Sequence, residues 1–458
     1  MPEGSGPGSA EHRARWMAGA LLLTAPGVAL ALLASACSGT AAASHAPARR
    51  DAVRPEARSA RPARPGQAVV ISLPGNARVH GTSFLLSVAC PARGDCVAGG
   101  YYTDKAGNSR AVIAAQAGGR WSRAIEVPLP AGSAPVQNAR VNSVACTGAG
   151  DCVAVGLYFS KVGSDHGFAV TEQHGRWGRA VSIGSPRNGD GRHSNLQAVA
   201  CASAGNCTAV GDYRIGPVLQ AMTVTETSGR WGRPDELVMP SDAGSNPLAY
   251  MTGIACPRPA DCVSGGYYDS TISEDQAAVG FVETAGVWHG GTEVAPASRT
   301  PGHGAELDAV SCGPTACLAA GSNTSSNPRE ALAVTESAGH WSGPVPMTSG
   351  PVTLSAGGAS LISCPGTRRC YAAVTSAFLP GGGFAPPPIP AGTPVLLALA
   401  WTGGLWVATT AAVQPAHAGL GGPAFDAVGC AADGYCVAVG ADSISGQAGS
   451  RPLATVLG

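Results

Sequence analysis

A short sequence phrase that contains two cysteines occurs seven times along the chain. Each copy is an apolar segment ending in Cys, a turn of about five residues, a second Cys and an alternating Val/Ala/Gly segment. The copies are SVACPARGDCVAGG (87–100), SVACTGAGDCVAVG (143–156), AVACASAGNCTAVG (198–211), GIACPRPADCVSGG (253–266), AVSCGPTACLAAG (309–321), LISCPGTRRCYAAV (361–374) and AVGCAADGYCVAVG (427–440). The first cysteines recur about every 55 residues, with one longer interval. Because a period of this size marks a chain built from supersecondary units, the sequence predicts a repeat protein.

Sequence for two further strands follows each copy. In the third repeat, AMTVTETSGRW (221–231) ends at a Gly-x-Trp turn and GRPDELVMP (232–240) ends in Pro. Four short strands joined by Gly- and Asn/Asp-containing turns are typical of a propeller blade. We therefore predict an all-β fold, a seven-bladed β-propeller of four-stranded antiparallel blades, over residues 67–458.

The two ends of this region predict how the ring closes. The seventh repeat runs only to PLATVLG (452–458), without a Trp turn, whereas AVVISLP (68–74) precedes the first copy and resembles AIEVPLP (124–130). We expect this N-terminal strand to complete the last blade. The rival architecture, an open solenoid, would leave sheet edges that need capping.

Fourteen of the fifteen cysteines belong to the repeats, two in each copy. A tight hairpin brings such a pair within reach of a disulfide, whereas pairs spread around a ring cannot converge on one zinc ion. Disulfides in turn indicate an oxidising compartment outside the cytoplasm. The predicted bridges, each within one repeat, are Cys90–Cys96, Cys146–Cys152, Cys201–Cys207, Cys256–Cys262, Cys312–Cys317, Cys364–Cys370 and Cys430–Cys436.

The N-terminal segment has the three parts of a secretory signal, with basic residues, an apolar run and small residues before Cys37. We predict a signal peptide over 1–36 and an Ala/Pro/Arg-rich disordered linker over 37–66. Residues 33–37 (LASAC) resemble the lipobox of bacterial lipoproteins, although Ala34 stands where that motif favours Leu. The resemblance implies lipidation of Cys37 and attachment to the outer face of the membrane. Ordinary cleavage with secretion, or an uncleaved anchor, are the alternatives.

One position of the repeat is the candidate binding site. Four residues before each first Cys, where the innermost strand begins, the side chains are mostly short and polar, so they could form a ring at one mouth of a central channel. This ring could bind a cation, a sugar or a peptide terminus, or order water alone. The ring positions are Leu86, Asn142, Gln197, Thr252, Asp308, Ser360 and Asp426. A Gly/Pro-rich insertion at 376–394, in the sixth repeat, is a second candidate recognition surface.

Composition and motifs exclude several function classes. Acidic and basic residues are equal in number, 29 each, so no electrostatic footprint for nucleic acid is present. None of the usual hydrolase, zinc-protease or nucleotide-binding motifs occurs, so we predict no catalytic residue, no metal site and no cofactor. The repeated Glu172, Glu226, Glu283 and Glu336 lie before Gly-x-Trp turns that distantly resemble the Asp-box hairpins of sialidase propellers, which are structural in that family.

Residues 67–458 as a whole resemble bacterial secreted and lipoprotein β-propellers, and that fold hosts binding and catalysis alike. We expect a non-enzymatic, membrane-tethered binding or scaffold propeller whose partner is an envelope protein or a cell-wall glycan. The alternative is a carbohydrate-active enzyme, a glycoside hydrolase or lyase, with its site at the propeller mouth.

Overall fold

The computed structural model describes residues 68–271 and, beyond them, 275–294, 304–313, 316–323, 330–349, 352–355, 361–366, 369–374, 376–377, 395–402, 405–411, 423–443 and 449–456. All regular structure in these residues is β-strand. The predicted signal peptide, the linker, Cys37, Ser360 and residues 378–394 of the insertion lie outside them.

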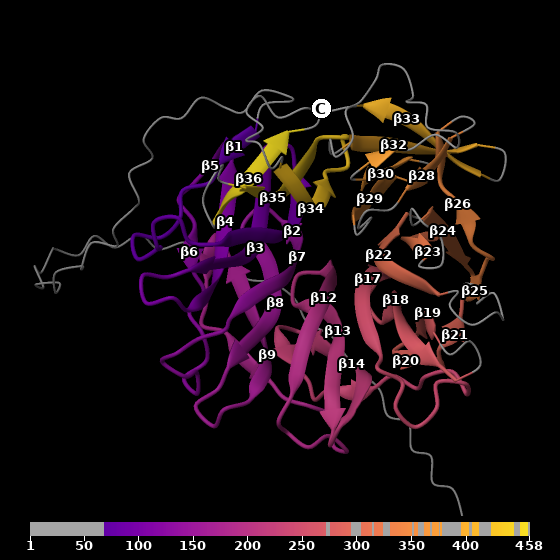
Figure 1. Cartoon of the computed structure of the whole chain (residues 1–458), viewed down its shortest axis with the longest axis horizontal. Helices are drawn as coiled ribbons and strands as arrows, with labels where there is room; N and C mark the ends of the chain where they lie inside the picture. The colour runs from indigo at the N-terminus through magenta and orange to yellow at the C-terminus, as the bar shows by residue number, and fades with distance from the viewer. Residues whose placement is uncertain are drawn as a thin grey trace, which may run out of the picture. The chain divides into compact units, whose positions relative to one another are not determined.

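Each of the first four repeats forms one antiparallel sheet. Three long strands make a meander, and two short strands pair with the third in place of the single fourth strand that we predicted (Figure 1). The strands are β2 (Ser83–Ala92), β3 (Asp95–Thr103), β4 (Ser109–Ala117), β5 (Arg120–Trp121) and β6 (Ile125–Glu126); β7 (Arg140–Gly148), β8 (Asp151–Phe159), β9 (Asp165–Gln173), β10 (Arg176–Trp177) and β11 (Val181–Ile183); β12 (Ser194–Ser203), β13 (Asn206–Ile215), β14 (Val218–Thr227), β15 (Arg230–Trp231) and β16 (Asp235–Glu236); β17 (Tyr250–Arg258), β18 (Asp261–Ser270), β19 (Asp275–Thr284), β20 (Val287–Trp288) and β21 (Thr292–Glu293).

The fifth and sixth repeats share one sheet. The short strand β28 pairs with β24, and β27 pairs with β33, so the segment between the repeats joins them into a twelve-stranded sheet. The described residues therefore form six sheets, where we predicted seven separate blades. The strands are β22 (Ala305–Cys312), β23 (Cys317–Asn323), β24 (Glu330–Ser337), β25 (His340–Trp341) and β26 (Val345–Pro346); β27 (Thr348–Ser349), β28 (Val352–Ser355) and β31 (Ser376–Ala377); β29 (Leu361–Gly366), β30 (Arg369–Val374), β32 (Val395–Thr402) and β33 (Leu405–Ala411).

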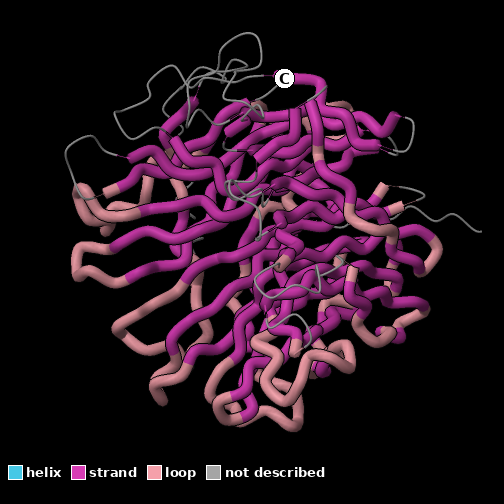
Figure 2. Tube along the Cα trace, turned by 45° about the vertical axis from the view of Figure 1, so that its right-hand side comes forward, coloured by secondary structure: helices cyan, strands magenta, loops and turns pink. Residues whose placement is uncertain are grey.

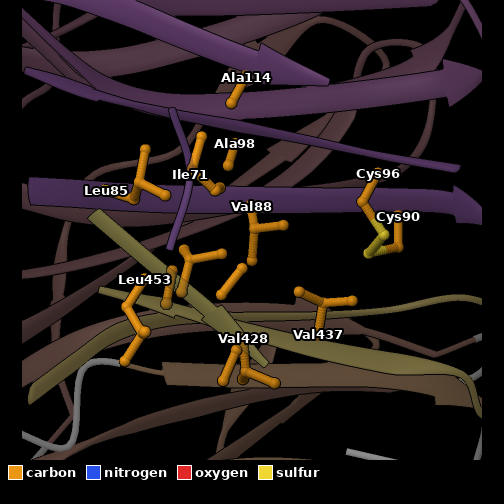
Figure 3. Packing of buried hydrophobic residues seen from close by; sticks show 14 of the residues in the cluster. Ile71, Leu85, Val88, Cys90, Cys96, Ala98, Ala114, Val428, Val437 and Leu453 are labelled. Atoms are coloured by element: carbon orange, nitrogen blue, oxygen red, sulfur yellow. A yellow bond between two sulfur atoms is a disulfide. The ribbon is translucent and has the colours of Figure 1, made fainter. Parts of the chain in front are cut away.

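The last sheet combines the two ends of the described chain. Its strands are β34 (Pro423–Cys430), β35 (Cys436–Ser443), β36 (Ser450–Val456) and β1 (Ala68–Val70), and β1 pairs antiparallel with β36 with Ala68 opposite Thr455. The Ser83 hydroxyl donates to the Ser450 carbonyl at 2.7 Å, and the Ser450 hydroxyl donates to the Ser83 carbonyl at 2.8 Å. Figure 3 shows Ile71, which follows β1, and side chains of β2, β3 and β4 packing with side chains of β34, β35 and β36 in one apolar cluster. The first and seventh repeats are thus joined by backbone pairing, hydrogen bonds and a common core.

The first strands of the seven repeats lie side by side around a channel. They contact one another in the order β2, β7, β12, β17, β22, β29 and β34, and β34 contacts β2 in turn (Figures 1 and 2). Serine side chains bridge neighbouring first strands: the Ser87 hydroxyl accepts the Val144 amide proton at 2.9 Å, and Ser363 accepts that of Cys430 at 3.1 Å. Repeated antiparallel sheets whose first strands surround a channel are the architecture of a β-propeller.

Disulfides and short polar side chains hold the hairpins at one end of the sheets. Bridges within a repeat are present in six copies, from Cys90–Cys96 to Cys430–Cys436, and Cys364 of the remaining copy is also disulfide-bonded. The side chain of Cys370 lies outside the described part. The Asp151 carboxylate accepts the His174 amide proton at 3.2 Å, and that of Asp261 accepts the Ala285 amide proton at 2.9 Å. These carboxylates therefore tie the Cys hairpin to the Gly-x-Trp hairpin of the same sheet.

Candidate functional site

Two cavities lie along the channel, one on each side of a ring of Val and Ile side chains. The first, of about 340 Å³, is lined by the first cysteines of the repeats, and we call it the disulfide-end cavity. The second, of about 280 Å³, lies at the other end, and we call it the mouth cavity. Residues that line both cavities are Val88, Val199, Ile254, Val310, Ile362 and Val428. This apolar ring lies between the two cavities and separates the two ends of the channel.

The predicted ring positions come together in the mouth cavity. Six of the seven, all but the undescribed Ser360, line it: Leu86, Asn142, Gln197, Thr252, Asp308 and Asp426. Each of these six residues is also the extra residue of a β-bulge in the first strand, because the pairing register skips it in every case. A bulge re-aims a side chain and bends the strand. This local irregularity is what directs the six side chains into the cavity.

A glycine opposite each bulge permits this geometry. A Cβ on Gly156 would lie 1.9 Å from the Arg140 carbonyl oxygen, and one on Gly211 would lie 1.9 Å from that of Asn195. Gly100, Gly266 and Gly321 meet the corresponding carbonyls at 1.8–2.0 Å. Any side chain would therefore push the first and second strands apart. The glycine that ends most copies of the repeat is the sequence signal for the bulge, and our reading of the sequence missed it.

A chain of polar contacts surrounds the cavity across the second and third sheets. Arg140 donates to the Asn142 side-chain oxygen at 2.8 Å, and Asn142 donates in turn to the side-chain oxygen of Asn195 at 2.9 Å. Asn195 and Gln197 each donate to Asp212 Oδ1 at 3.4 Å. Asn142 and Gln197 are thus held in place by neighbours that the sequence did not single out.

His193 extends this network and carries a positive charge at neutral pH. Its Nε2 lies 2.8 Å from Asp212 Oδ2, and its Nδ1 lies 3.8 Å from Asp165 Oδ2. The carboxylates of Asp165 and Asp212 raise the pKa of His193 to about 9, and the same contact lowers the pKa of Asp165. The imidazolium therefore neutralises part of the negative charge beside the mouth.

Asp426 differs from the other carboxylates at the mouth. Its Oδ2 is buried and has no hydrogen-bond partner among the described residues. Burial raises the pKa of Asp426 to about 6, because desolvation disfavours the charged form. The carboxylate nevertheless influences Tyr101 of the first sheet, whose pKa is raised by burial and by Asp426 and lowered by Arg140.

Two stacked aromatic pairs lie two residues before the bulges. Phe84 and Tyr101 are opposite each other on β2 and β3 with ring centroids 5.6 Å apart, and Tyr250 and Tyr267 are opposite each other on β17 and β18 at 5.2 Å. Burial raises the pKa of Tyr267 to about 12, and the charges of Glu306, Asp308 and Asp212 add to the shift. All four rings are half-buried. These rings do not line the mouth cavity, whose polar lining consists of amides, carboxylates and hydroxyls, but Tyr101 and Tyr267 lie close enough to feel the charges of Asp426 and Asp308.

Thr252, Asp308 and Leu86 are the remaining described positions of the ring at the mouth. The Thr252 hydroxyl contacts the carbonyls of Gly265 and Leu307, so it links the fourth and fifth sheets. Asp308 lies in the cavity beside Thr252, and Leu86 is the apolar member of the ring. Within the described residues, no group of three or more His, Cys, Asp or Glu side chains is placed to hold a metal ion. No helix in that part of the chain has the length and apolarity to span a membrane.

Solved structures of other proteins match the chain only at low similarity. No protein-family model and no curated protein sequence matches the chain. A lectin from Burkholderia pseudomallei is 14% identical, with 80% of this chain and 97% of the lectin covered and a TM-score of 0.44. The β-propeller domain of the Trilobed protease from Pyrococcus furiosus is 8% identical, with 79% and 90% covered and a TM-score of 0.47. A six-bladed fucose-binding lectin from Aleuria aurantia is 12% identical, with 75% and 99% covered and a TM-score of 0.33. At these values the similarity says nothing of a ligand or an activity for this chain.

Proposed function

We propose that this protein is a non-enzymatic binding propeller that takes a polar ligand, a saccharide of the cell envelope, in its mouth cavity. The observation that carries the proposal is that bulges in six first strands direct six side chains into one cavity. A bulge leaves a residue unpaired in the ladder, so its repetition at one level of the channel favours a use for those side chains. An envelope protein that presents a polar group is the alternative partner.

The chemistry of the mouth fits a saccharide. Sugar hydroxyls both donate and accept hydrogen bonds, so they suit amide, hydroxyl and carboxylate groups such as those of Gln197, Thr252 and Asp308. Tyr101 and Tyr267 lie outside the cavity lining but close enough for the charges of Asp426 and Asp308 to act on them, and their aromatic rings would suit the apolar face of a sugar that extends from the cavity. A cavity of about 280 Å³ is near the lower limit of small-ligand sites, so it suits one sugar unit or a chain end.

We further propose that the seven repeats act as seven blades of a closed ring, although the fifth and sixth share hydrogen bonds. The circular order of contacts between first strands and the pairing of β1 with β36 support this arrangement. The tether proposal is that residues 1–36 are removed as a signal, that Cys37 is lipidated, and that 37–66 holds the propeller off the outer face of the membrane. The disulfides support an extracytoplasmic site. The insertion at 376–394 remains a second proposed contact surface.

The test is binding of the full chain, purified in detergent with its disulfides intact, to an array of envelope glycans and to envelope extract. Two variants locate the site. Leu86→Trp fills the mouth cavity, and Pro257→Trp places the same bulk at the disulfide-end cavity. Binding that is lost with Leu86→Trp and kept with Pro257→Trp supports the proposal. Binding that survives Leu86→Trp would refute the mouth as the site.

One observation favours the enzymatic alternative. Asp308 and Asp426 line the same cavity, and a carboxyl with a pKa of about 6 is suited to donate a proton near neutral pH. A glycoside hydrolase would need both carboxyl groups. Release of reducing sugar from any bound glycan by the wild type, abolished in Asp426→Asn, would replace the binding proposal with this one.

A further inference from the structure

The sector of the mouth around Asp426 points to one kind of ligand group. Resting on the proposed function, we infer that Asp426 recognises a positively charged amino group, so that the preferred saccharide is an amino sugar with a free amine.

One carboxylate oxygen of Asp426 lacks, among the described residues, the hydrogen-bond partner that a buried polar atom requires. Its Oδ2 is shielded from solvent and has no hydrogen-bond partner among the described residues. Leaving a charged group in this state is costly, whereas a hydrogen bond to a charged partner is among the stronger ones in proteins. An ammonium group supplies both the charge and the N–H donors. By contrast, Asp212 already accepts from His193, Asn195 and Gln197.

The surroundings of Asp426 leave this charge for the ligand to neutralise. Arg140 donates to Asn142, and its charge and that of Asp426 act on Tyr101 with opposite sign. Burial accounts for the raised pKa of Asp426, with no opposing cation among the described residues, and a pKa of about 6 leaves the group mostly ionised at pH 7. The neighbouring ring position, Leu86 of β2, is apolar and supplies no donor.

Aromatic and acidic residues beside Asp426 favour a cation further. The Phe84–Tyr101 pair lies on the adjacent sheet, and the charge of Asp426 reaches Tyr101. Aromatic faces attract cations as well as sugar rings. Asp308, across the cavity, adds a second carboxylate to the lining. The mouth thus presents more negative than positive groups to a ligand, which disfavours acidic sugars.

Two oligosaccharides that differ only in this group test the inference. The probes are a glucosamine hexamer and an N-acetylglucosamine hexamer, titrated calorimetrically against the full chain at pH 7. We expect the glucosamine hexamer to bind roughly 10-fold tighter or more, which is the scale of one charge-assisted hydrogen bond. In Asp426→Asn, an isosteric change, this preference should disappear.

A matched control and the remaining outcomes complete the test. Asp433→Asn removes the same charge at the disulfide end of the same repeat, where Asp433 pairs with Arg93 at 2.7 Å, and should keep the preference. Thermal unfolding of each variant verifies that it is folded. Equal binding of both hexamers, or a preference that persists in Asp426→Asn, overturns the inference and leaves the saccharide proposal standing. Binding of other glycans on the array but of neither hexamer does the same. Failure to bind any glycan overturns both.

Discussion

Replacing Gly211 with alanine should separate β12 from β13 at the bulge that carries Gln197. The added Cβ would lie 1.9 Å from the Asn195 carbonyl oxygen and 3.0 Å from the Leu196 Cα. Real Cβ atoms essentially never approach another heavy atom closer than 3.0 Å, so the strands must move apart by about 1 Å. Overpacking of this kind costs roughly 3 kcal/mol, because both strands are held by their ladders and by the disulfide between Cys201 and Cys207.

Hydrogen exchange measures this cost locally. A loss of about 3 kcal/mol should accelerate exchange of the β12 and β13 amides by roughly 100-fold, since 1.4 kcal/mol is a factor of ten. Gly184→Ala is the matched control, because a Cβ there meets nothing within 4 Å, and it should change stability by less than about 0.5 kcal/mol. Because the bulge directs Gln197 into the mouth cavity, Gly211→Ala should also weaken ligand binding. Equal exchange rates in the two variants would refute the close approach as the reason for the glycine.

Three further predictions concern the rest of the propeller. Glu226 is 1% exposed, and this burial raises the pKa of its carboxyl group above the ordinary value of 4.5, so the group contributes most to stability below pH 4.5 and this contribution is lost as pH rises through the folded-state pKa. Glu226→Gln cannot ionise, so the substitution should increase the melting temperature more at pH 7 than at pH 4. An identical dependence of the melting temperature on pH in the variant and the wild type would contradict this. The first repeat already has a glutamine at this position: Gln116 accepts a hydrogen bond from Tyr435 at 3.2 Å. The Ser450 hydroxyl donates to the Ser83 carbonyl and accepts the Ser83 amide proton, so Ser450→Ala should lower the free energy of unfolding in urea by about 1–3 kcal/mol. An unchanged urea midpoint would show that the junction of the first and seventh repeats is not part of the cooperative unit. Replacing both Cys201 and Cys207 with serine should cost about 2 kcal/mol by loop entropy, whereas a loss near zero in the same assay would mean that the hairpin is equally constrained when reduced.

The repeat pattern predicted most of the fold because each copy contains the residues typical of a strand, a turn and a disulfide. Each Cys pair marks a hairpin, and the alternation around it marks the two long strands, so the propeller architecture and the intrarepeat bridges follow from local sequence. The division of the fourth strand into pairs such as β5 and β6 was not predictable from segments that simply end in Pro. Nor was the sheet shared by the fifth and sixth repeats, because it depends on hydrogen bonds of β27 and β28, which lie between the copies.

The sequence predicted which residues form the candidate site but not the backbone geometry that directs their side chains into the cavity. Counting four residues back from each first Cys located the six side chains that line the mouth cavity. The reason they point there is the bulge, whose signal is a glycine fourteen residues further along in most copies and thirteen in the fifth. The repeat pattern did not reveal the residues that hydrogen-bond to the ring residues or to one another beside the mouth, since these positions differ in chemistry from copy to copy. They are Arg140, Asn195, His193 and Asp212. Whether an Asp426 oxygen has a hydrogen-bond partner depends on the side chains of neighbouring sheets, so the sequence of one repeat could not predict that Oδ2 has none among the described residues.

Photo-crosslinking tests most directly whether the mouth cavity is the binding site. A diazirine amino acid close in size to leucine, which leaves the mouth cavity open where Leu86→Trp fills it, is introduced at Leu86, which lines the mouth cavity, or at Pro257, which lines the disulfide-end cavity. Each protein is irradiated with the glycan that the array identifies, and covalent adducts are measured by mass spectrometry. Our account predicts an adduct from position 86 and none from position 257. An adduct from position 257 alone, with the glycan still bound by the position-86 protein, would contradict it.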